Sequence, residues 1–148
     1  MAYTYNNIGL PLTTTDAANN QTTYEYDLSG NLLKTTDAKG KSVSYTYDSN
    51  YNKTSSTDAN GNTTWYTYTG NMKQNIVALP DGNTIEYVYD SEDRAIKVID
   101  QNGKATTTEY DDAGRIISVQ DTDKNSVYYE YDAVGNVLKE TGKTGAKT

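Results

Sequence analysis

Pairs of aromatic positions separated by one mostly polar residue, in the pattern Tyr-x-Tyr, recur along the chain with a fixed spacing of 21 residues. The segment Tyr24-Glu25-Tyr26-Asp27 shows the period-two pattern of a β-strand that has one face in water. A fixed period of this length indicates stacked supersecondary units, each of which is completed by its neighbours. The second tyrosine of the pattern recurs as Tyr5, Tyr26, Tyr47, Tyr68, Tyr89, Tyr110 and Tyr131, and the first as Tyr3, Tyr24, Tyr45, Tyr66, Tyr87 and Tyr129, with Thr108 in the sixth unit.

Each tyrosine strand is followed by turn-forming residues. Leu28-Ser29-Gly30 predicts a three-residue hairpin loop with a bulge, because glycine readily adopts the left-handed conformation that this loop requires. Tyr51, Met72 and Asp93 occupy the glycine position in the third, fourth and fifth units, so we expect those three turns to form differently. A second turn, typified by Asp37-Ala38-Lys39-Gly40, has the composition of a type I turn.

A short return strand lies between the two turns of each unit. In the second unit we expect it at residues 31–36, with Leu33 and Thr35 both on the inward face. The column that contains Leu33 is apolar in most units but polar at Thr54 and Asn75, so the inward face should be least apolar in the third and fourth units.

Seven such hairpins predict an all-β repeat array of fourteen antiparallel strands. We expect one array over residues 1–141 and a flexible tail over residues 142–148. Long sheets twist and curl, so a curved spiral sheet with the tyrosine columns on its concave side is expected. These columns are interpreted as a structural ladder that consists of Tyr24, Tyr26, Tyr45, Tyr47, Tyr66, Tyr68, Tyr87, Tyr89, Tyr110, Tyr129 and Tyr131.

Composition narrows the functional classes. The net charge of −7 argues against nucleic acid or an anionic membrane as a partner, since both select clusters of Lys and Arg. The sequence contains no Cys and no His, so disulfides, thiol chemistry and the commonest general base and metal ligand are absent. No apolar run approaches the roughly 20 residues of a membrane span, and no signal peptide is recognisable. We therefore expect no enzyme activity, no cofactor, no metal site and no membrane insertion.

The motif Tyr-x-Tyr-Asp-x-x-Gly, followed by a short strand and Asp-x-x-Gly, closely resembles the YD-repeat family, which is also called the Rhs repeat family. The best matches are residues 24–30, 109–115 and 129–136, and the resemblance covers essentially the whole chain. It departs from the family pattern at Asn6 and Thr69, at Thr108, and at Asn19 and Lys124 in the second turn. These departures bear on local turn geometry.

The resemblance implies more than the residues do. Proteins of this family are large secreted or cell-surface molecules, including bacterial toxins and the animal teneurins, whose repeats form a spiral β-shell that often encloses a C-terminal toxin. It implies a structural segment of such a shell, with neighbouring repeats of a longer parent protein as its partners. Because the chain begins directly on a tyrosine strand and stops one strand past Tyr131, we expect an excised part of a longer array.

The alternative hypothesis is a module that binds carbohydrate or protein. Trp65 precedes Tyr66 by one residue and should point to the opposite, outer face, where an exposed aromatic side chain can mark a contact site. Tyr128 holds the equivalent position in the seventh unit. A glycan is the ligand considered for this pair and for the exposed part of the tyrosine ladder. Incidental packing of Trp65 and Tyr128, and a purely structural ladder, are the simpler interpretations. Open sheet edges also suggest self-association.

Acidic residues offer two further candidates. Asp121-Thr122-Asp123-Lys124-Asn125 resembles the start of an EF-hand loop, but Ser126 replaces the glycine at position six and Asp132 replaces the final glutamate. The strand carboxylates recur with the repeat, which indicates a solvated face and turn capping rather than a catalytic pair.

Overall fold

A computed structural model describes residues 1–144 and consists of β-strands and turns. The chain divides into two compact units, the first formed by Met1–Tyr68 with Ala78–Asp81 and the second by Thr69–Val77 with the residues from Gly82 onward. The first unit contains β1 (Ala2–Tyr5), β2 (Pro11–Thr15), β3 (Gln21–Tyr26), β4 (Leu32–Thr36), β5 (Ser42–Tyr47), β6 (Lys53–Thr57) and β7 (Thr63–Tyr68). The second contains most of β8 (Gln74–Ala78), then β9 (Thr84–Tyr89), β10 (Ala95–Ile99), β11 (Ala105–Tyr110), β12 (Ile116–Gln120), β13 (Ser126–Tyr131) and β14 (Val137–Lys143).

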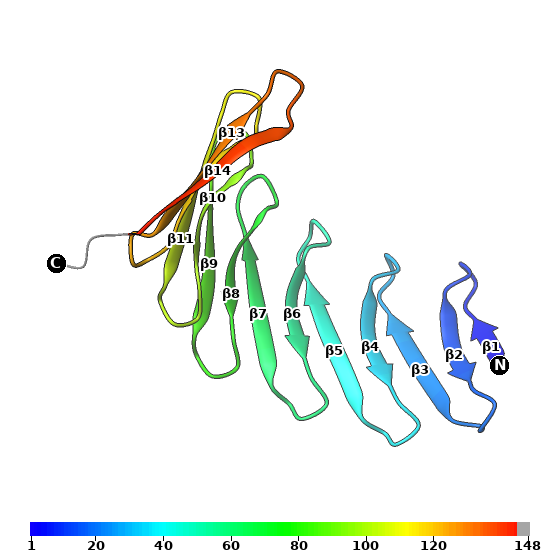
Figure 1. Ribbon diagram of the computed structural model, residues 1–148. Coiled ribbons are helices and arrows are strands. Elements are labelled where there is room, and N and C mark those ends of the chain that lie inside the picture. The colour runs from blue at the N-terminus through cyan, green and yellow to red at the C-terminus, as the bar shows by residue number, and fades with distance from the viewer. Residues whose placement is uncertain (145–148) are drawn as a thin grey trace. The chain divides into compact units, whose positions relative to one another are not determined.

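Strands follow chain order within each unit. From β1 to β7, and again from β9 to β14, each strand pairs antiparallel with the strand before it. In the first unit, Figure 1 shows the strands side by side and joined by short turns. The predicted all-β array of antiparallel hairpins with a 21-residue period is therefore confirmed. Strand β14 continues to Lys143, two residues beyond the expected array boundary at 141, and residues 145–148 of the expected tail lie outside the described part of the chain.

Both faces of the sheet are accessible to solvent in each unit. Val77, at 8% exposure, is the sole buried hydrophobic residue among those described, and the buried polar residues are Ser55, Ser118 and Ser126. Most ladder tyrosines are half-buried. Stability must therefore come from strand pairing and cross-strand side-chain contacts rather than from a closed core.

Each unit pairs its tyrosine strand with the return strand that follows it. Wherever this pairing is described, a β-bulge lies next to the turn that joins the two strands. In the second unit Tyr26 pairs with Leu32 while Glu25 pairs with Lys34, so Leu33 is the extra residue. Residues that pair directly share a face, which places Leu32 rather than Leu33 on the tyrosine face. In the next unit Thr54, the equivalent of Leu33, bonds through Oγ1 to Thr46 Oγ1 on the opposite face. The expectation that Leu33 faces inward with Thr35 is wrong, because the bulge shifts the alternation by one residue.

The turns share one set of hydrogen bonds. In the second unit the Gly30 N–H donates to the Asp27 carbonyl oxygen, and Asp27 Oδ1 accepts from the N–H groups of Ser29 and Asn31. The second turn repeats this arrangement, since Asp37 Oδ1 accepts from the N–H groups of Lys39 and Lys41. An aspartate thus caps the turn at either end of the hairpin.

The turns that lack glycine keep this geometry. Tyr51, Met72 and Asp93 adopt φ values of 65°, 60° and 63°, and each N–H still donates to the carbonyl oxygen three residues earlier. Asn19 and Lys124 behave in the same way, both with φ of 65°. The expectation that the three turns form differently is wrong, because the five-residue hydrogen-bond pattern holds non-glycine residues in the left-handed region despite its steric cost.

Candidate functional surfaces

The tyrosine face carries a repeated hydrogen bond between neighbouring strands. Beyond the pair Lys34–Ser44, the β4–β5 ladder ends and the hydroxyl of Tyr47 donates to the Leu32 carbonyl oxygen at 3.0 Å. In four later units the second tyrosine of the Tyr-x-Tyr pattern donates the same bond to the carbonyl oxygen of the residue 15 positions earlier. These bonds join Tyr68 to Lys53, Tyr89 to Gln74, Tyr110 to Ala95 and Tyr131 to Ile116. Each hydroxyl therefore connects the tyrosine strand of one repeat to the beginning of the return strand of the repeat before it. Five members of the predicted tyrosine ladder therefore make a specific contact between repeats.

Burial affects the ionisation of these phenols. The pKa values of Tyr26, Tyr47, Tyr68 and Tyr89 are raised above the ordinary tyrosine value, chiefly because partial burial disfavours the charged phenolate. The neighbouring tyrosine of the same strand adds a smaller contribution in each case. The hydroxyls of Tyr47, Tyr68 and Tyr89 thus remain neutral donors at physiological pH.

Two arginines join consecutive repeats in the second unit. Arg115 Nε donates to Asp111 Oδ2 at 2.7 Å, its Nη1 reaches the Asp132 carbonyl oxygen at 3.3 Å, and its guanidinium carbon lies 4.7 Å from the centre of the Tyr131 ring. Arg94 makes the equivalent three contacts one repeat earlier, with Asp90, Asp111 and Tyr110. Each guanidinium therefore bonds both to the turn of its own repeat and to the turn of the following repeat.

Sequence reasoning missed these arginines. They occupy the column that holds Asn31, Asn52 and Asn136 in other units, where the amide also bonds to the turn aspartate. The sequence feature that could have identified them is their position, four residues after the turn aspartate. An arginine there is long enough to reach the following repeat, whereas an asparagine is not.

Trp65 lies on the face opposite the tyrosine ladder and is 55% exposed. Its direct partner across β6 and β7 is Ser55, which is only 4% exposed and pairs on its other side with Thr46. The Ser55 and Thr46 hydroxyls are 2.6 Å apart. The structure thus places Trp65 beside a row of hydroxyl groups.

Tyr128 occupies the same column and is 42% exposed. Its direct partner is Ser118, which is 7% exposed and pairs on its other side with Glu109. The Ser118 hydroxyl donates to Glu109 Oε2 at 2.7 Å. Tyr128 and Trp65 therefore sit in matching backbone surroundings but have neighbours of different charge.

Two other glutamates on the strands, Glu25 and Glu130, are exposed and form ion pairs. Glu25 lies 3.5 Å from Lys34 Nζ and Glu130 lies 3.2 Å from Lys139 Nζ, each across one hairpin. Cross-strand pairs of this kind stabilise the sheet modestly.

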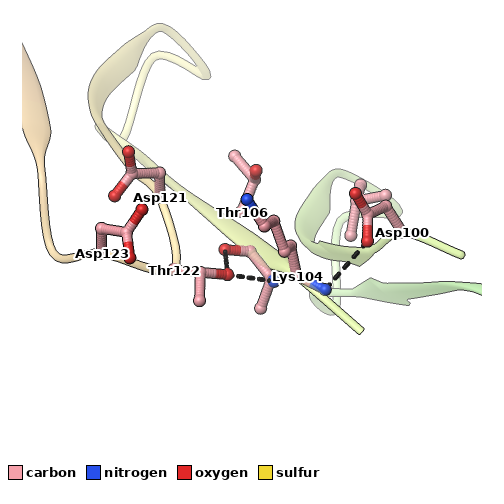
Figure 2. Close-up of a pocket in the computed structure, with 8 residues that line it drawn as sticks. Asp100, Lys104, Thr106, Asp121, Thr122 and Asp123 are labelled. Atoms are coloured by element: carbon pink, nitrogen blue, oxygen red, sulfur yellow. Dashed lines mark hydrogen bonds between the residues drawn. The ribbon is translucent and has the colours of Figure 1, made fainter. Parts of the chain in front are cut away.

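The aspartates of the EF-hand-like segment line a small pocket in the second unit, together with residues of the preceding turn. Figure 2 shows Asp121, Thr122 and Asp123 on one side and Asp100 and Lys104 on the other. Asp121 Oδ1 and Oδ2 already accept hydrogen bonds from the backbone and side chain of Asn125. The Thr122 hydroxyl donates to the Ala105 carbonyl oxygen at 3.0 Å and accepts from its N–H at 2.6 Å. Among residues 1–144 no group of three or more acidic side chains is arranged to hold a metal ion.

No helix long and apolar enough to cross a membrane occurs in the described residues.

Comparison with known proteins identifies the repeat. The model of the RHS Repeat family matches residues 5–42, 26–63, 89–126 and 110–147. The first two matches overlap, as do the last two, and together the four cover most of the chain. No curated protein sequence matches significantly.

Solved structures show the same fold at low sequence identity. The crystal structure of TcdB2-TccC3-Cdc42 matches with a TM-score of 0.76 and 20% identity, over 94% of this chain and 9% of that chain. That of TcdB2-TccC3 gives a TM-score of 0.75 and 21% identity, with the same coverage. The Photorhabdus luminescens Tc holotoxin pore with a TccC3 mutation gives 0.61 and 16%, over 95% of this chain and 11% of that chain. The chain thus spans about a tenth of the length of these structures.

Proposed function

The chain belongs to the RHS repeat family, and we propose that it is a structural segment of a larger secreted or cell-surface protein, forming part of the wall of a β-shell that encloses a toxin or other cargo. The likeness in fold to the Tc toxin structures supports this proposal, since each of those chains is about ten times longer than the matched region. In this role the segment has no catalytic activity.

The observation that carries the proposal is the direction of the side-chain contacts. The tyrosine hydroxyls and the two arginines bond to the repeat next to their own. The turn aspartates are occupied by their own backbone N–H groups and by Asn or Arg side chains. These polar groups therefore serve the continuity of the sheet, which is what a wall requires.

The outermost strands provide the attachment to the rest of the wall. Within residues 1–144, β1 pairs only with β2, and β14 pairs only with β13. All residues of β1 and β14 are exposed. Unpaired edges readily accept another strand, so neighbouring repeats of the parent protein would pair there.

Lengthening the array tests the structural function. Chains extended by one 21-residue unit at a time should gain free energy of unfolding in nearly equal steps, because each unit adds one repeat and one interface. Small-angle X-ray scattering with light scattering should show the maximum dimension growing with each added unit. Constant stability on extension would contradict the proposal, as would hydrolase or transferase activity in the purified chain that is lost on substitution of its own residues.

A further inference from the structure

A pocket in the first unit lies between the turn that joins β3 to β4 and the turn that joins β5 to β6. Both turns lie at the same edge of the sheet (Figure 1). The pocket has a volume of about 500 Å³, within the roughly 300–1,000 Å³ range of small-molecule sites. Its lining includes Asp27, Asn31, Tyr47, Asp48 and Tyr51. This inter-turn slot therefore presents acidic and aromatic groups, and none of its lining residues is cationic.

The second unit shows which group occupies the equivalent place between later turns. Arg115, four repeats after Asn31, donates from Nε to Asp111 Oδ2 at 2.7 Å. Its Nη1 donates to the Asp132 carbonyl oxygen at 3.3 Å, and its guanidinium carbon lies 4.7 Å from the centre of the Tyr131 ring. Arg94 makes the same three contacts one repeat earlier. A guanidinium group therefore fits between two consecutive turns of this kind.

The same set of partners lines the inter-turn slot. The residues that stand four repeats before the three partners of Arg115 are Asp27, Tyr47 and Asp48. Asn31 takes the place of the arginine, and its side-chain amide donates to Asp27 Oδ2, in its own turn, at 2.8 Å. The slot thus contains the groups that bind a guanidinium in the second unit, without the guanidinium itself.

Two oxygen atoms of the slot keep the capacity to accept another hydrogen bond. Among the described residues, Asp27 Oδ2 accepts from the Asn31 amide. The Asp48 carbonyl oxygen accepts from the Tyr51 N–H at 3.1 Å. Each of these oxygens has a second acceptor position. The equivalent carbonyl in the second unit, that of Asp132, accepts two bonds, which shows that both positions can be filled in this turn.

The carboxylates of the slot are ionised at neutral pH. Hydrogen bonds from neighbouring asparagine side chains are the main cause that lowers the pKa values of Asp27 and Asp48. The pKa of the Tyr47 phenol is raised by burial, then by Tyr45, and then by the negative charge of Asp27. The charge of Asp27 is therefore felt at the Tyr47 side chain.

Tyr51 adds a second aromatic ring to the slot. It is 62% exposed and adopts φ of 65°, at a position that is glycine in four of the seven units. A left-handed tyrosine has a steric cost, and strained backbone of this kind is concentrated at binding sites. Tyr51 is also the one aromatic residue at this position of the repeat. An exposed ring close to carboxylates is suited to binding a cation.

These features select a planar cation as the ligand. Two carboxylates and no cationic lining residue disfavour an anion. Among residues 1–144 no group of three or more acidic side chains is arranged to hold a metal ion. An ammonium group is a compact point charge, whereas a guanidinium donates hydrogen bonds in one plane and stacks on aromatic rings. The arginine side chain therefore matches the slot better than the lysine side chain does.

We propose that the inter-turn slot binds an arginine side chain of a partner polypeptide, with the guanidinium stacked on Tyr47. Its N–H groups donate to Asp27 Oδ2 and to the Asp48 carbonyl oxygen, and Tyr51 supplies a second ring. The bound side chain completes, between the second and third repeats, the contact that Arg115 makes further along the chain. The slot lies wholly within the first unit, so its binding does not depend on a structural role in a shell wall.

Titration of the whole ¹⁵N-labelled chain with three peptides, followed by amide chemical shifts, tests the proposal. The probes are Gly-Arg-Gly with both ends blocked and the same peptide with lysine or citrulline at its centre. Citrulline has the shape of arginine but no charge. The arginine peptide should cause saturable shifts centred on Asn31, Asp48 and Tyr51, with a dissociation constant in the millimolar range. The lysine peptide should bind more weakly, and the citrulline peptide should not bind.

Three outcomes of this titration would overturn the proposal. The first is the absence of a saturable shift with the arginine peptide at millimolar concentrations. The second is a set of shifts centred away from the slot. The third is binding of the lysine or citrulline peptide as tightly as the arginine peptide.

Variants of the slot test the individual contacts. Asn31→Arg places the chain's own guanidinium in the slot, as in the second unit, and should abolish binding of the arginine peptide. Tyr51→Gly supplies the residue of four other repeats and removes the ring, so binding should weaken about three- to fivefold. Asp27→Asn should also weaken binding, because it removes the charge. This variant keeps an oxygen that can cap the turn, as Asn6 does in the first repeat.

Asp58→Asn is the matched control for general electrostatic attraction. Asp58 caps a turn at the other edge of the same unit, where its Oδ1 accepts from the N–H groups of Asn60 and Asn62. Its substitution removes an equal charge and should leave the affinity unchanged. Dispersed amide spectra establish that each variant is folded, and the titration of the unsubstituted chain still tests the proposal if Asp27→Asn does not fold. Unchanged binding in folded Asn31→Arg, or an equal loss in Asp58→Asn and Asp27→Asn, would overturn the assignment.

Discussion

The hydroxyl of Tyr47 donates a 3.0 Å hydrogen bond to the backbone carbonyl oxygen of Leu32, at the point where the ladder between β4 and β5 has ended. The phenol replaces the main-chain donor that the diverging strand no longer supplies. The side chain therefore extends the contact between two repeats beyond their backbone pairing.

Removal of this hydroxyl should destabilise the first unit. Tyr47→Phe keeps the ring but leaves the Leu32 carbonyl without that donor, so the free energy of unfolding should fall by about 1 kcal/mol. Tyr45→Phe is the control, because no hydrogen bond of the Tyr45 hydroxyl is found in residues 1–144 and its loss should cost less than about 0.5 kcal/mol. Urea denaturation measures both. Equal effects of the two substitutions would show that the Tyr47–Leu32 bond contributes nothing.

The left-handed turn position should distinguish glycine from other residues. Gly30 has φ of 91°, and an added Cβ would lie 3.4 Å from Leu10 Cδ1. Gly30→Ala should therefore lower the free energy of unfolding by about 1–2 kcal/mol.

The equivalent position in the third unit should show the same preference for glycine. Tyr51 adopts φ of 65° in the same turn. Tyr51→Gly should therefore be more stable than Tyr51→Ala by about 1 kcal/mol, since only glycine enters this region without steric cost. Thermal unfolding of the two variants under identical conditions measures the difference, and an alanine variant at least as stable as the glycine variant would contradict it.

Arg115 and Tyr131 should be energetically coupled. Arg115→Asn restores the residue found at this position in other repeats and keeps a partner for Asp111, but it removes the contacts with Asp132 and Tyr131. A double-mutant cycle with Tyr131→Leu should give a coupling free energy of about 0.5–1 kcal/mol. Additive effects would mean that the guanidinium and the ring do not interact. The pair Arg115→Asn and Tyr45→Leu, in different units, supplies the additive control.

Acid should destabilise the fold through its turns. Hydrogen bonds to the carboxylates lower the pKa values of nine turn aspartates below the ordinary value: Asp16, Asp27, Asp48, Asp58, Asp90, Asp100, Asp111, Asp121 and Asp132. A lowered pKa in the folded state stabilises the fold above the unfolded pKa of about 4, and this contribution is lost as the pH falls further. The unfolding temperature should therefore be nearly constant between pH 7 and 5 and decrease below pH 4.

The charge of the whole chain acts in the opposite direction, because protonation relieves repulsion associated with a net charge of −7. Measurements in 0.5 M salt screen that repulsion and leave the local hydrogen bonds in place. Asp27→Asn should reduce the dependence on pH, since it removes one of the titrating groups. An unfolding temperature that rises on acidification in high salt would contradict the prediction.

The repeat period predicted the positions of the strands and turns correctly, because these positions depend on local residue patterns. The column of Leu33 was misplaced because a bulge moves a side chain to the other face, and alternation alone cannot locate the extra residue. Tyr51 was expected to change its turn because propensity opposes a left-handed tyrosine, but the surrounding hydrogen bonds prevail. The sequence predicted that Trp65 and Tyr128 are exposed aromatic residues, but it did not predict what surrounds Tyr128. Its surroundings depend on the register of β11 to β14, which joins Glu109, Ser118 and Tyr128 in one row.

The turn that Asp27 caps has the same hydrogen bonds as the turn that Asp48 caps 21 residues later. A recombination event that joins Asp27 directly to residue 49 would remove one whole hairpin and leave every retained strand with a partner at the equivalent position of the repeat. Duplication at the same point would add a hairpin with equal ease. Because the turns match, the gain or loss of a whole unit at this point would preserve the hydrogen bonds of every remaining turn.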